Sequence, residues 1–301
     1  MFLNRWRTLF LLTSALCLLA PGAATAATLY VWTNSPNPGF PFNTWSNAAR
    51  TIQAAVDAAQ SNDTVWVTNG VYATGGRPAP GGSLTNRLVV TNAITIASVN
   101  GPSNTFIVGK SPRGINAVRC VYMTAGMLSG FTLTNGHTAN SAGGARDDVG
   151  GGALADGGIL SNCVITSCSA RQSGGGAAYS ELVDCTVSYS EAFLGNGGGL
   201  YGCNATRCDI FGNWTIYYYG GGAATSVLVG CTISSNQAVS DNLGRGGGGY
   251  ACTASNSMFA WNLAEAQGGG VCLGVLYNCT LVGNTCSNHR WRCLRCHVDR
   301  L

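Results

Sequence analysis

The clearest pattern along the chain is a repeat of about two dozen residues, in which glycine triplets alternate with short apolar strands. The triplets begin at Gly150, Gly174, Gly197, Gly220, Gly247 and Gly268, at intervals of 24, 23, 23, 27 and 21 residues. Each triplet precedes a recurring strand that starts at Cys163, Cys185, Cys208, Cys231, Ser257 or Cys279. A fixed period of this length indicates a solenoid.

Within the recurring strand, alternate side chains point to the same face. Each Cys therefore shares a face with the apolar residue two positions along, namely Ile165, Val187, Ile210, Ile233, Phe259 or Leu281. One unit cannot bury this face alone, but units stacked about 4.8 Å apart bury a continuous core. The pattern predicts an all-β fold, a single-stranded right-handed parallel β-helix solenoid over residues 63–285.

Asparagine and glycine indicate how the units turn. Asparagine recurs five residues after the Cys position, at Asn213, Asn236, Asn262 and Asn284, and Gly130–Leu133 resembles an earlier copy with Asn135 at the Asn position. Stacked at one corner, such residues predict a ladder of side-chain amides along the axis. The triplets are expected at sharp turns that need a positive φ or exclude a Cβ.

The segment before the repeat predicts a cap. Ile52, Ala55, Val56 and Ala59 fall on one face of a predicted helix. Because the open end of a solenoid exposes backbone groups and core, we expect residues 27–62 to form an N-terminal strand and a short capping helix.

The beginning of the chain predicts export. Arg5 and Arg7 precede an apolar run from Leu9 to Ala20, and small residues follow at 24–26. This order is typical of a signal peptide, here residues 1–26. We therefore expect a secreted protein, or one associated with the cell surface or outer membrane, with no transmembrane segment after signal removal.

Charge excludes one class of partner. The net charge is +4, but the signal contributes +2 and the last twelve residues +3, so the body carries −1. Only 9% of the residues are charged. Neither value fits a nucleic-acid-binding surface, and we expect no nucleic acid partner.

The fourteen cysteines allow two interpretations. In an exported chain they could form disulfides, but those at one repeat position are expected to stack inward as free thiols. In the tail, Cys286-x-x-His289 and Cys293-x-x-Cys296-His297 match zinc and haem-attachment spacings. We interpret residues 286–301 instead as an atypical basic tail, truncated or out of frame, and expect no metal site.

The combined pattern resembles bacterial pectin-lyase-like right-handed β-helix proteins. The resemblance rests on the glycine and Cys-Thr-x-x-x-Asn repeat and on the N-terminal segments 51–59, 63–67, 70–72 and 98–102. Phe259-Ala-Trp-Asn262 is also similar to the GGA(I)/FxxN repeats of polymorphic outer-membrane proteins. The resemblance implies the fold, whereas lyases, hydrolases, adhesins and structural stalks all occur on it.

The resemblance also implies what an enzyme of this class would need. Its lyases use Ca²⁺ held by clustered Asp with a basic residue, and its hydrolases use close carboxylate pairs. Here base, acid and cation converge only in the long insertion before Gly150, so the candidate catalytic residues are His137, Arg146, Asp147 and Asp148, with Asp156 close behind. The alternative is a solvated loop. No cofactor is expected, and Ca²⁺ only for a lyase.

The aromatic run before Gly220 is the candidate ligand-binding segment. Trp214, Tyr217, Tyr218 and Tyr219 lie there, and strand alternation would place Tyr217 and Tyr219 on one side and Tyr218 on the other. Exposed rings on a rigid face suit sugar rings. The alternative is packing against neighbouring coils.

These observations favour an exported or cell-surface β-helix protein, adhesive, polysaccharide-binding or structural, over an enzyme. It would act as a monomer on a polysaccharide or cell-surface glycan. The alternatives are a polysaccharide lyase or glycoside hydrolase, and a fragment of a larger anchored protein.

Overall fold

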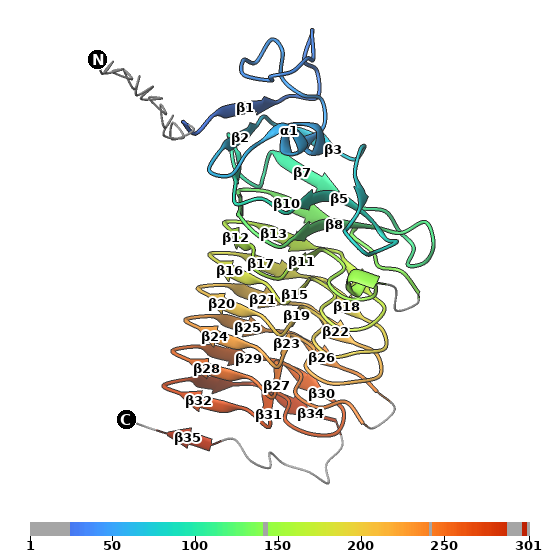
Figure 1. The fold of residues 1–301 in the computed structure, drawn as a ribbon. Helices are drawn as coiled ribbons and strands as arrows, with labels where there is room; N and C mark the ends of the chain where they lie inside the picture. The colour runs from blue at the N-terminus through green and yellow to red at the C-terminus, as the bar shows by residue number, and fades with distance from the viewer. Residues whose placement is uncertain (1–24, 141–143, 241–242, 288–296, 300–301) are drawn as a thin grey trace, which may run out of the picture.

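The computed structural model describes residues 25–140, 144–240, 243–287 and 297–299, so most of the predicted signal peptide and of the basic tail lies outside the described residues. The chain forms a right-handed parallel β-helix with one short α-helix at its N-terminal end, as the repeat predicts (Figure 1). In each regular coil the chain passes through four sheets, here named C, A, B and D in the order of the chain.

Sheets A and B carry most of the core-facing aliphatic residues. The strands of sheet A, in spatial order, are β1 (Thr28–Val31), β2 (Thr64–Val67), β6 (Thr95–Ser98), β9 (Met127–Ser129), β12 (Ile159–Ser161), β16 (Glu181–Val183), β20 (Asn204–Thr206), β24 (Val227–Val229), β28 (Thr253–Ser255), β32 (Val275–Tyr277) and β35 (His297–Asp299). Those of sheet B are β3 (Gly70–Tyr72), β7 (Thr105–Val108), β10 (Thr132–Thr134), β13 (Val164–Thr166), β17 (Thr186–Ser188), β21 (Asp209–Phe211), β25 (Thr232–Ser234), β29 (Met258–Ala260) and β33 (Thr280–Val282).

Sheets C and D flank the glycine triplets. Sheet C contains β4 (Arg77–Pro78), β5 (Thr85–Val90), β8 (Val118–Met123), β11 (Ala153–Ala155), β15 (Ala177–Ala178), β19 (Leu200–Tyr201), β23 (Ala223–Ala224), β27 (Gly249–Tyr250) and β31 (Val271–Cys272). Sheet D contains β14 (Ser169–Ala170), β18 (Glu191–Ala192), β22 (Trp214–Thr215), β26 (Gln237–Ala238), β30 (Leu263–Ala264) and β34 (Thr285–Cys286). All described pairings between these named strands are parallel except that of β4 with β5.

The corner between sheets A and B holds the predicted stack of cysteines, which we call the Cys ladder: Cys163, Cys185, Cys208, Cys231, Ser257 and Cys279. The backbone N–H of Cys163 donates to Sγ of Cys185 at 3.4 Å, and the same bond recurs from Cys185 to Cys208. Each described cysteine of this ladder is a free thiol. The apolar residues two positions on belong to the same core as far as Phe259, which confirms the predicted facing there, whereas Leu281 in the last coil is exposed.

The corner between sheets B and D holds the Asn ladder, formed by Cys168, Ser190, Asn213, Asn236, Asn262 and Asn284. Asn213 Nδ2 donates to Asn236 Oδ1 at 3.0 Å, which confirms amide bonding along the axis. In a third ladder, at the corner between sheets C and A, serine and cysteine alternate as Ser180, Cys203, Ser226 and Cys252.

Every one of these corners is made in the same way. The residue before the ladder position has a positive φ, for example Asp184 (54°) before Cys185 and Tyr189 (49°) before Ser190. This left-handed residue turns the chain and leaves the next side chain pointing inward. Charged and aromatic residues occupy these positions as well as glycine, which the sequence pattern did not indicate.

Two predicted alignments are one residue off. Asn135 has φ 54° and occupies the turn, so that Gly136, the residue after it, takes the ladder position. The fifth triplet begins at Gly246 rather than Gly247, because Gly249 pairs with Ala223 and Gly246 carries the positive φ of 66°. In each triplet the first glycine needs its positive φ, whereas a Cβ on the other two would collide with neighbouring backbone or side-chain atoms.

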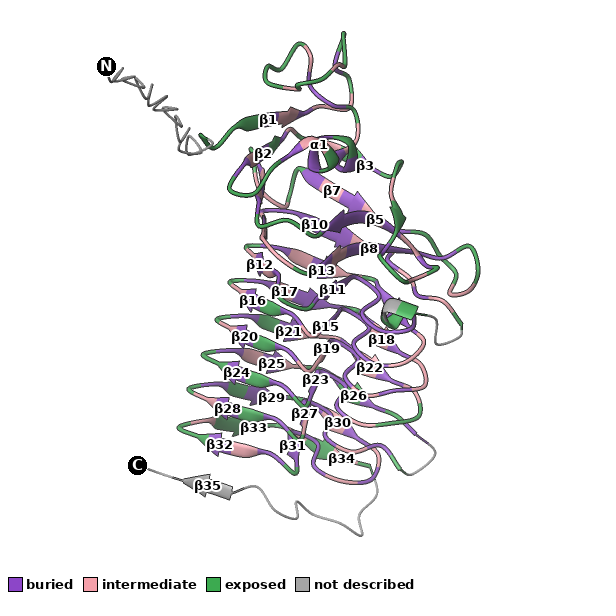
Figure 2. Ribbon diagram, in the orientation of Figure 1, coloured by how far each residue is buried: buried purple, intermediate pink, exposed green. Residues whose placement is uncertain are grey.

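The helix α1 (Ile52–Ala58) covers the N-terminal end of the core, as predicted. Thr51 caps it by accepting the N–H of Ala54, and Ile52, Ala55 and Val56 are buried. Figure 2 shows buried residues running through the coils below this helix, with exposed residues on their outer sides. The core is thus one continuous column.

Candidate functional site

Asp147, one of the catalytic candidates in the long insertion, has contacts that give it a structural role. It is completely buried, and its Oδ2 accepts the N–H and hydroxyl of Ser83 at 2.7 and 2.9 Å and the N–H of Leu84 at 3.0 Å. Arg119 is equally buried beside it, and burial lowers the pKa of this guanidinium to about 10. Asp147 therefore joins two loops and compensates a buried cation, a position that no polymer substrate reaches.

The other residues of this segment point elsewhere. Arg146, which ends the 3-10 turn η1 (Gly144–Arg146), pairs with Asp156 at 2.9 Å and lies 4.2 Å above the ring of Tyr179. Asp148 is buried. The structure therefore does not place Arg146 and Asp147 as one acid–cation pair, which weakens the catalytic interpretation of this loop.

His137 lies on a different surface, at the top of sheet D. It pairs with Ser169 in an isolated parallel bridge. Arg113 donates to Ser169 Oγ at 2.8 Å and to Glu191 at 2.7 Å, and its guanidinium lies over Phe193. Burial lowers the pKa of His137 below its usual value. A base, an acid and a cation thus converge here, and Arg113 was not among the sequence candidates.

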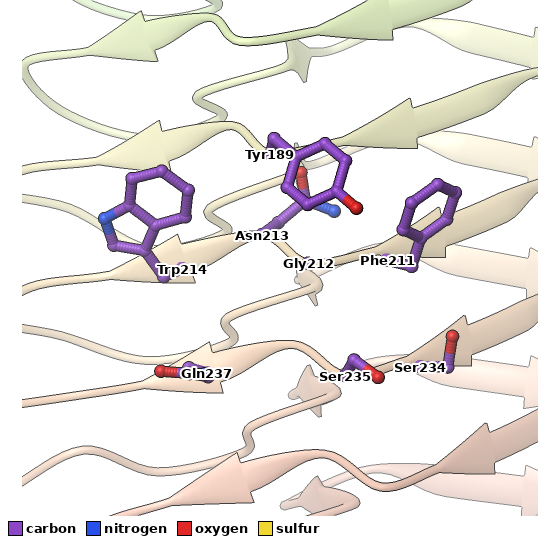
Figure 3. Close-up of a pocket in the computed structure, with 8 residues that line it drawn as sticks. All are labelled: Tyr189, Phe211, Gly212, Asn213, Trp214, Ser234, Ser235 and Gln237. Atoms are coloured by element: carbon purple, nitrogen blue, oxygen red, sulfur yellow. The ribbon is translucent and has the colours of Figure 1, made fainter.

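The aromatic candidate Trp214 belongs to the same column of outward side chains. In sheet D, Glu191 pairs with Trp214 and Trp214 with Gln237, so the indole lies one coil below the Arg113–Glu191 pair. Beside it is a hollow of about 410 Å³ at the corner of sheets B and D (Figure 3). Its lining is formed by Tyr189, Phe211, Gly212, Asn213, Trp214, Ser234, Ser235 and Gln237.

The walls of this hollow, which we call the aromatic hollow, combine rings and small polar groups. Tyr189 and Phe211 meet edge to face with 5.5 Å between their centroids. Figure 3 shows Trp214 and Phe211 on opposite sides, with Ser234, Ser235 and Gln237 one coil below. The lining contains no charged side chain. Such a surface can stack on an apolar ligand face and hydrogen-bond to groups at its rim.

The side chains of Tyr217, Tyr218 and Tyr219 do not alternate between the two faces of a strand, so the prediction that they would is wrong. Strand β22 ends at Thr215 and the chain then bends, so Tyr217 and Tyr218 are both exposed. Tyr217 packs on Phe193, and Tyr219 lies 4.6 Å from Tyr250. These rings lie beyond the aromatic hollow, outside its lining.

Sequence reasoning identified Trp214, and it placed Tyr189, Phe193 and Trp261 in the same stretch of other units, but it did not identify Phe211. Phe211 and Tyr189 are one coil apart, and only the pairing of Ser188 with Phe211 brings them together. One feature of the sequence could have indicated the hollow: an aromatic residue at the turn position of one coil is followed by glycine at the turn position of the next. Tyr189 and Gly212 occupy the same turn position in successive coils, and a Cβ at Gly212 would lie 2.9 Å from the Tyr189 ring.

The described residues contain neither a group of metal-binding side chains nor a membrane-spanning helix. In the described part of the chain, no three His, Cys, Asp or Glu side chains are grouped so that they could hold a metal ion. Within the same ranges, no helix is both long and apolar enough to cross a membrane.

Comparison with known proteins identified likenesses of structure alone. No family model matches the chain, and no curated protein matches it. Among solved structures, the chain is similar to pectate lyase Pel9A, with 13% identity and a TM-score of 0.49 over 85% of this chain and 71% of that one. It is also similar to pectin methylesterase PemA from Erwinia chrysanthemi, with 12% identity and a TM-score of 0.47 over 89% and 93%.

A pectin methylesterase from Aspergillus niger is similar to the same degree, with 12% identity and a TM-score of 0.45 over 92% of this chain and 93% of that one. The parallel β-helix itself is given by the strand pairings of this chain.

Proposed function

We propose that the chain is an exported polysaccharide-binding solenoid whose aromatic hollow is the binding site. The observation that carries the proposal is the combination of Tyr189, Phe211 and Trp214 with hydroxyl and amide side chains on a surface of stacked coils. A sugar ring has an apolar C–H face and a rim of hydroxyls. Aromatic faces and small polar groups complement these two features separately.

The rigidity of the surface supports binding in particular. Asn213, between Phe211 and Trp214, is fully buried in the Asn ladder, so the backbone beneath the hollow is held by bonds to coils on both sides. A preformed surface loses little conformational entropy when a ligand binds. Weak stacking contacts then suffice for measurable affinity.

The proposal is tested by presenting the purified chain to an array of neutral and acidic glycans. We expect retention on a subset of glycans, and loss of that retention in Trp214→Gln, which introduces the residue found at this position one coil later. The matched control is Trp66→Ala, because Trp66 is an exposed tryptophan on sheet A. Equal retention by Trp214→Gln and the parent would contradict the proposal.

Polysaccharide cleavage is the second candidate, favoured by one observation. Arg113, His137 and Glu191 converge on the column that contains Trp214. A cation, a base and an acid beside a sugar-binding surface are the groups that proton transfer requires. Incubation with the retained glycans, followed by chromatography of the products, tests this candidate; intact polymer after prolonged incubation with the parent would exclude it.

A further inference from the structure

The corner between sheets B and D continues along the solenoid beyond the aromatic hollow. The turn positions between sheets B and D are occupied in successive coils by Tyr189, Gly212, Ser235, Trp261 and Gly283, with φ between 49° and 62°. Because the next residue enters the Asn ladder, these side chains point outward in a single row parallel to the axis. We call this row the corner row.

Two rings in the corner row are supported in the same manner. Tyr189 lies against Gly212, and Trp261 lies against Gly283, where a Cβ would be 2.9 Å and 2.4 Å from the respective rings. Glycine in the following coil therefore leaves room for each ring to cover the backbone. Trp261 is nonetheless 65% exposed, and Tyr189 is 56% exposed. Both rings remain available to a ligand.

Between the two rings the side chains of the corner row are small. Gly212 and Ser235 separate them in the corner row itself. On one side the flanking column is Phe211, Ser234 and Ala260, and on the other it is Trp214, Gln237 and Leu263. None of these residues is charged, and Ala260 is fully buried. We call the uncharged strip of surface between the two rings, from the hollow to Trp261, the trough.

We infer that this trough binds an unbranched polymer of neutral sugars, lying parallel to the solenoid axis, with Trp261 as a second stacking residue. The inference rests on the proposed function of the aromatic hollow. Tyr189 and Trp261 are three coils apart, about 14 Å at the spacing of paired strands. Several linked sugars cover that distance, so a short oligosaccharide reaches the hollow alone and a longer one reaches both rings.

The test compares cellobiose with cellohexaose by calorimetry on the full chain. The variant is Trp261→Ser, because Ser235 occupies the same turn position one coil earlier. We expect the parent to bind cellohexaose more tightly than cellobiose. Trp261→Ser should weaken cellohexaose binding roughly three- to tenfold, as loss of one aromatic contact does, and leave cellobiose binding unchanged. Trp261→Tyr should retain most of the affinity.

Two further measurements exclude other arrangements. Tyr217→Ala tests a chain lying across the coils, because Tyr217 follows Trp214 along the same coil. A loss of cellohexaose affinity in that variant, with none in Trp261→Ser, would overturn the axial arrangement. Tighter binding of hexagalacturonate than of cellohexaose would overturn the neutral class.

Failure of the inference can be separated from failure of the proposed function. If Trp214→Gln abolishes binding and Trp261→Ser leaves both oligosaccharides unaffected, the hollow binds sugar but the trough does not. If the parent binds no glycan of the array, both are wrong. Circular dichroism of each variant confirms that the β-structure is retained.

Discussion

At the scale of single residues, Asn236 shows how one buried side chain holds three coils together. Its Oδ1 accepts both the backbone and side-chain amides of Asn213 at 3.0 Å, and its Nδ2 donates to the carbonyl of Ile210 and to Asn262 Oδ1. The side chain is fully buried, so no water can replace these partners. Its loss leaves donors and acceptors unsatisfied in two neighbouring coils.

We therefore expect Asn236→Ala to lower the free energy of unfolding by about 2–4 kcal/mol. Asn236→Ser should cost less, because serine is accepted in the same ladder at Ser190. The exposed neighbour Gln237 provides the control, and Gln237→Ala should change stability by less than about 0.5 kcal/mol. Urea denaturation followed by circular dichroism measures all three; equal midpoints for Asn236→Ala and the parent would contradict the role of the ladder.

The buried thiols give the protein a dependence on alkaline pH. Burial raises the pKa of Cys203 to about 12 and that of Cys252 to about 11, from an ordinary value of 9.0. In the unfolded chain these thiols lose their protons near pH 9, whereas the folded chain keeps them. Unfolding therefore releases protons above pH 9, and stability is full below that pH and falls as the pH rises towards 12.

Cys203→Ser tests this effect within an unchanged ladder, since Ser180 and Ser226 already occupy equivalent positions. We expect the urea midpoint of the parent to fall between pH 9 and 11, and that of Cys203→Ser to fall less steeply. Parallel curves for the two proteins would show that this thiol does not contribute. Reducing agent in all samples keeps oxidation out of the comparison.

At the scale of elements, helix α1 is hydrogen-bonded to strand β5 through the side chain of Gln53. Gln53 is almost fully buried, and its amide pairs with both the N–H and the carbonyl of Val89 in β5, at 2.7 and 3.1 Å. The Gln53 amide thus bonds to Val89 as the backbone of a neighbouring strand would, in addition to the apolar contacts of the helix. Periodicity predicted the apolar face of the helix, but it assigned no partner to a glutamine on that face.

Gln53→Ala should cost about 2–3 kcal/mol locally, because it leaves both backbone groups of Val89 unpaired. The suitable measurement is hydrogen exchange, in which the amide of Val89 should exchange much faster while the coils around Asn236 keep their protection. Ala54→Gln, on the exposed side of α1, is the matched control. Unchanged exchange at Val89 in Gln53→Ala would refute this role.

The sequence was most informative where one coil repeats another. Spacing predicted the inward cysteines and the Asn ladder, since stacking places equal positions above one another. It misplaced the triplet at Gly247 because four consecutive glycines, Gly246–Gly249, do not define an alignment. It also misjudged Asp147, whose partners Ser83 and Leu84 lie more than 60 residues earlier in the chain. Contacts of that range leave no local pattern.

At the scale of the whole molecule, the charged groups lie outside the lining of the aromatic hollow, although the Arg113–Glu191 pair adjoins it. The lining of the aromatic hollow contains no Asp, Glu, His, Lys or Arg. The Arg113–Glu191 pair lies one coil above Trp214, and the Asp184–Arg207 pair lies at the corner of sheets A and B. A neutral sugar polymer can therefore bind without neutralising or displacing an ion.

This separation predicts binding that is nearly independent of ionic strength. Dissociation constants for a retained glycan should differ less than about twofold between 20 mM and 500 mM NaCl, because only charged contacts are screened over that range. Surface plasmon resonance at the two salt concentrations gives the comparison. A tenfold weakening at high salt would instead indicate that arginines bind an acidic polymer.

The three ladders also give the solenoid a direction. In each of them the backbone N–H donates to a side chain of the following coil, as from Cys163 to Cys185, from Ser190 to Asn213 and from Ser180 to Cys203. A coil that has already formed therefore presents a ready template of donors to the segment synthesised next. Growth of the ladders can then keep pace with the emergence of the chain, starting from the capped end, because each ladder residue finds its partner in the next coil.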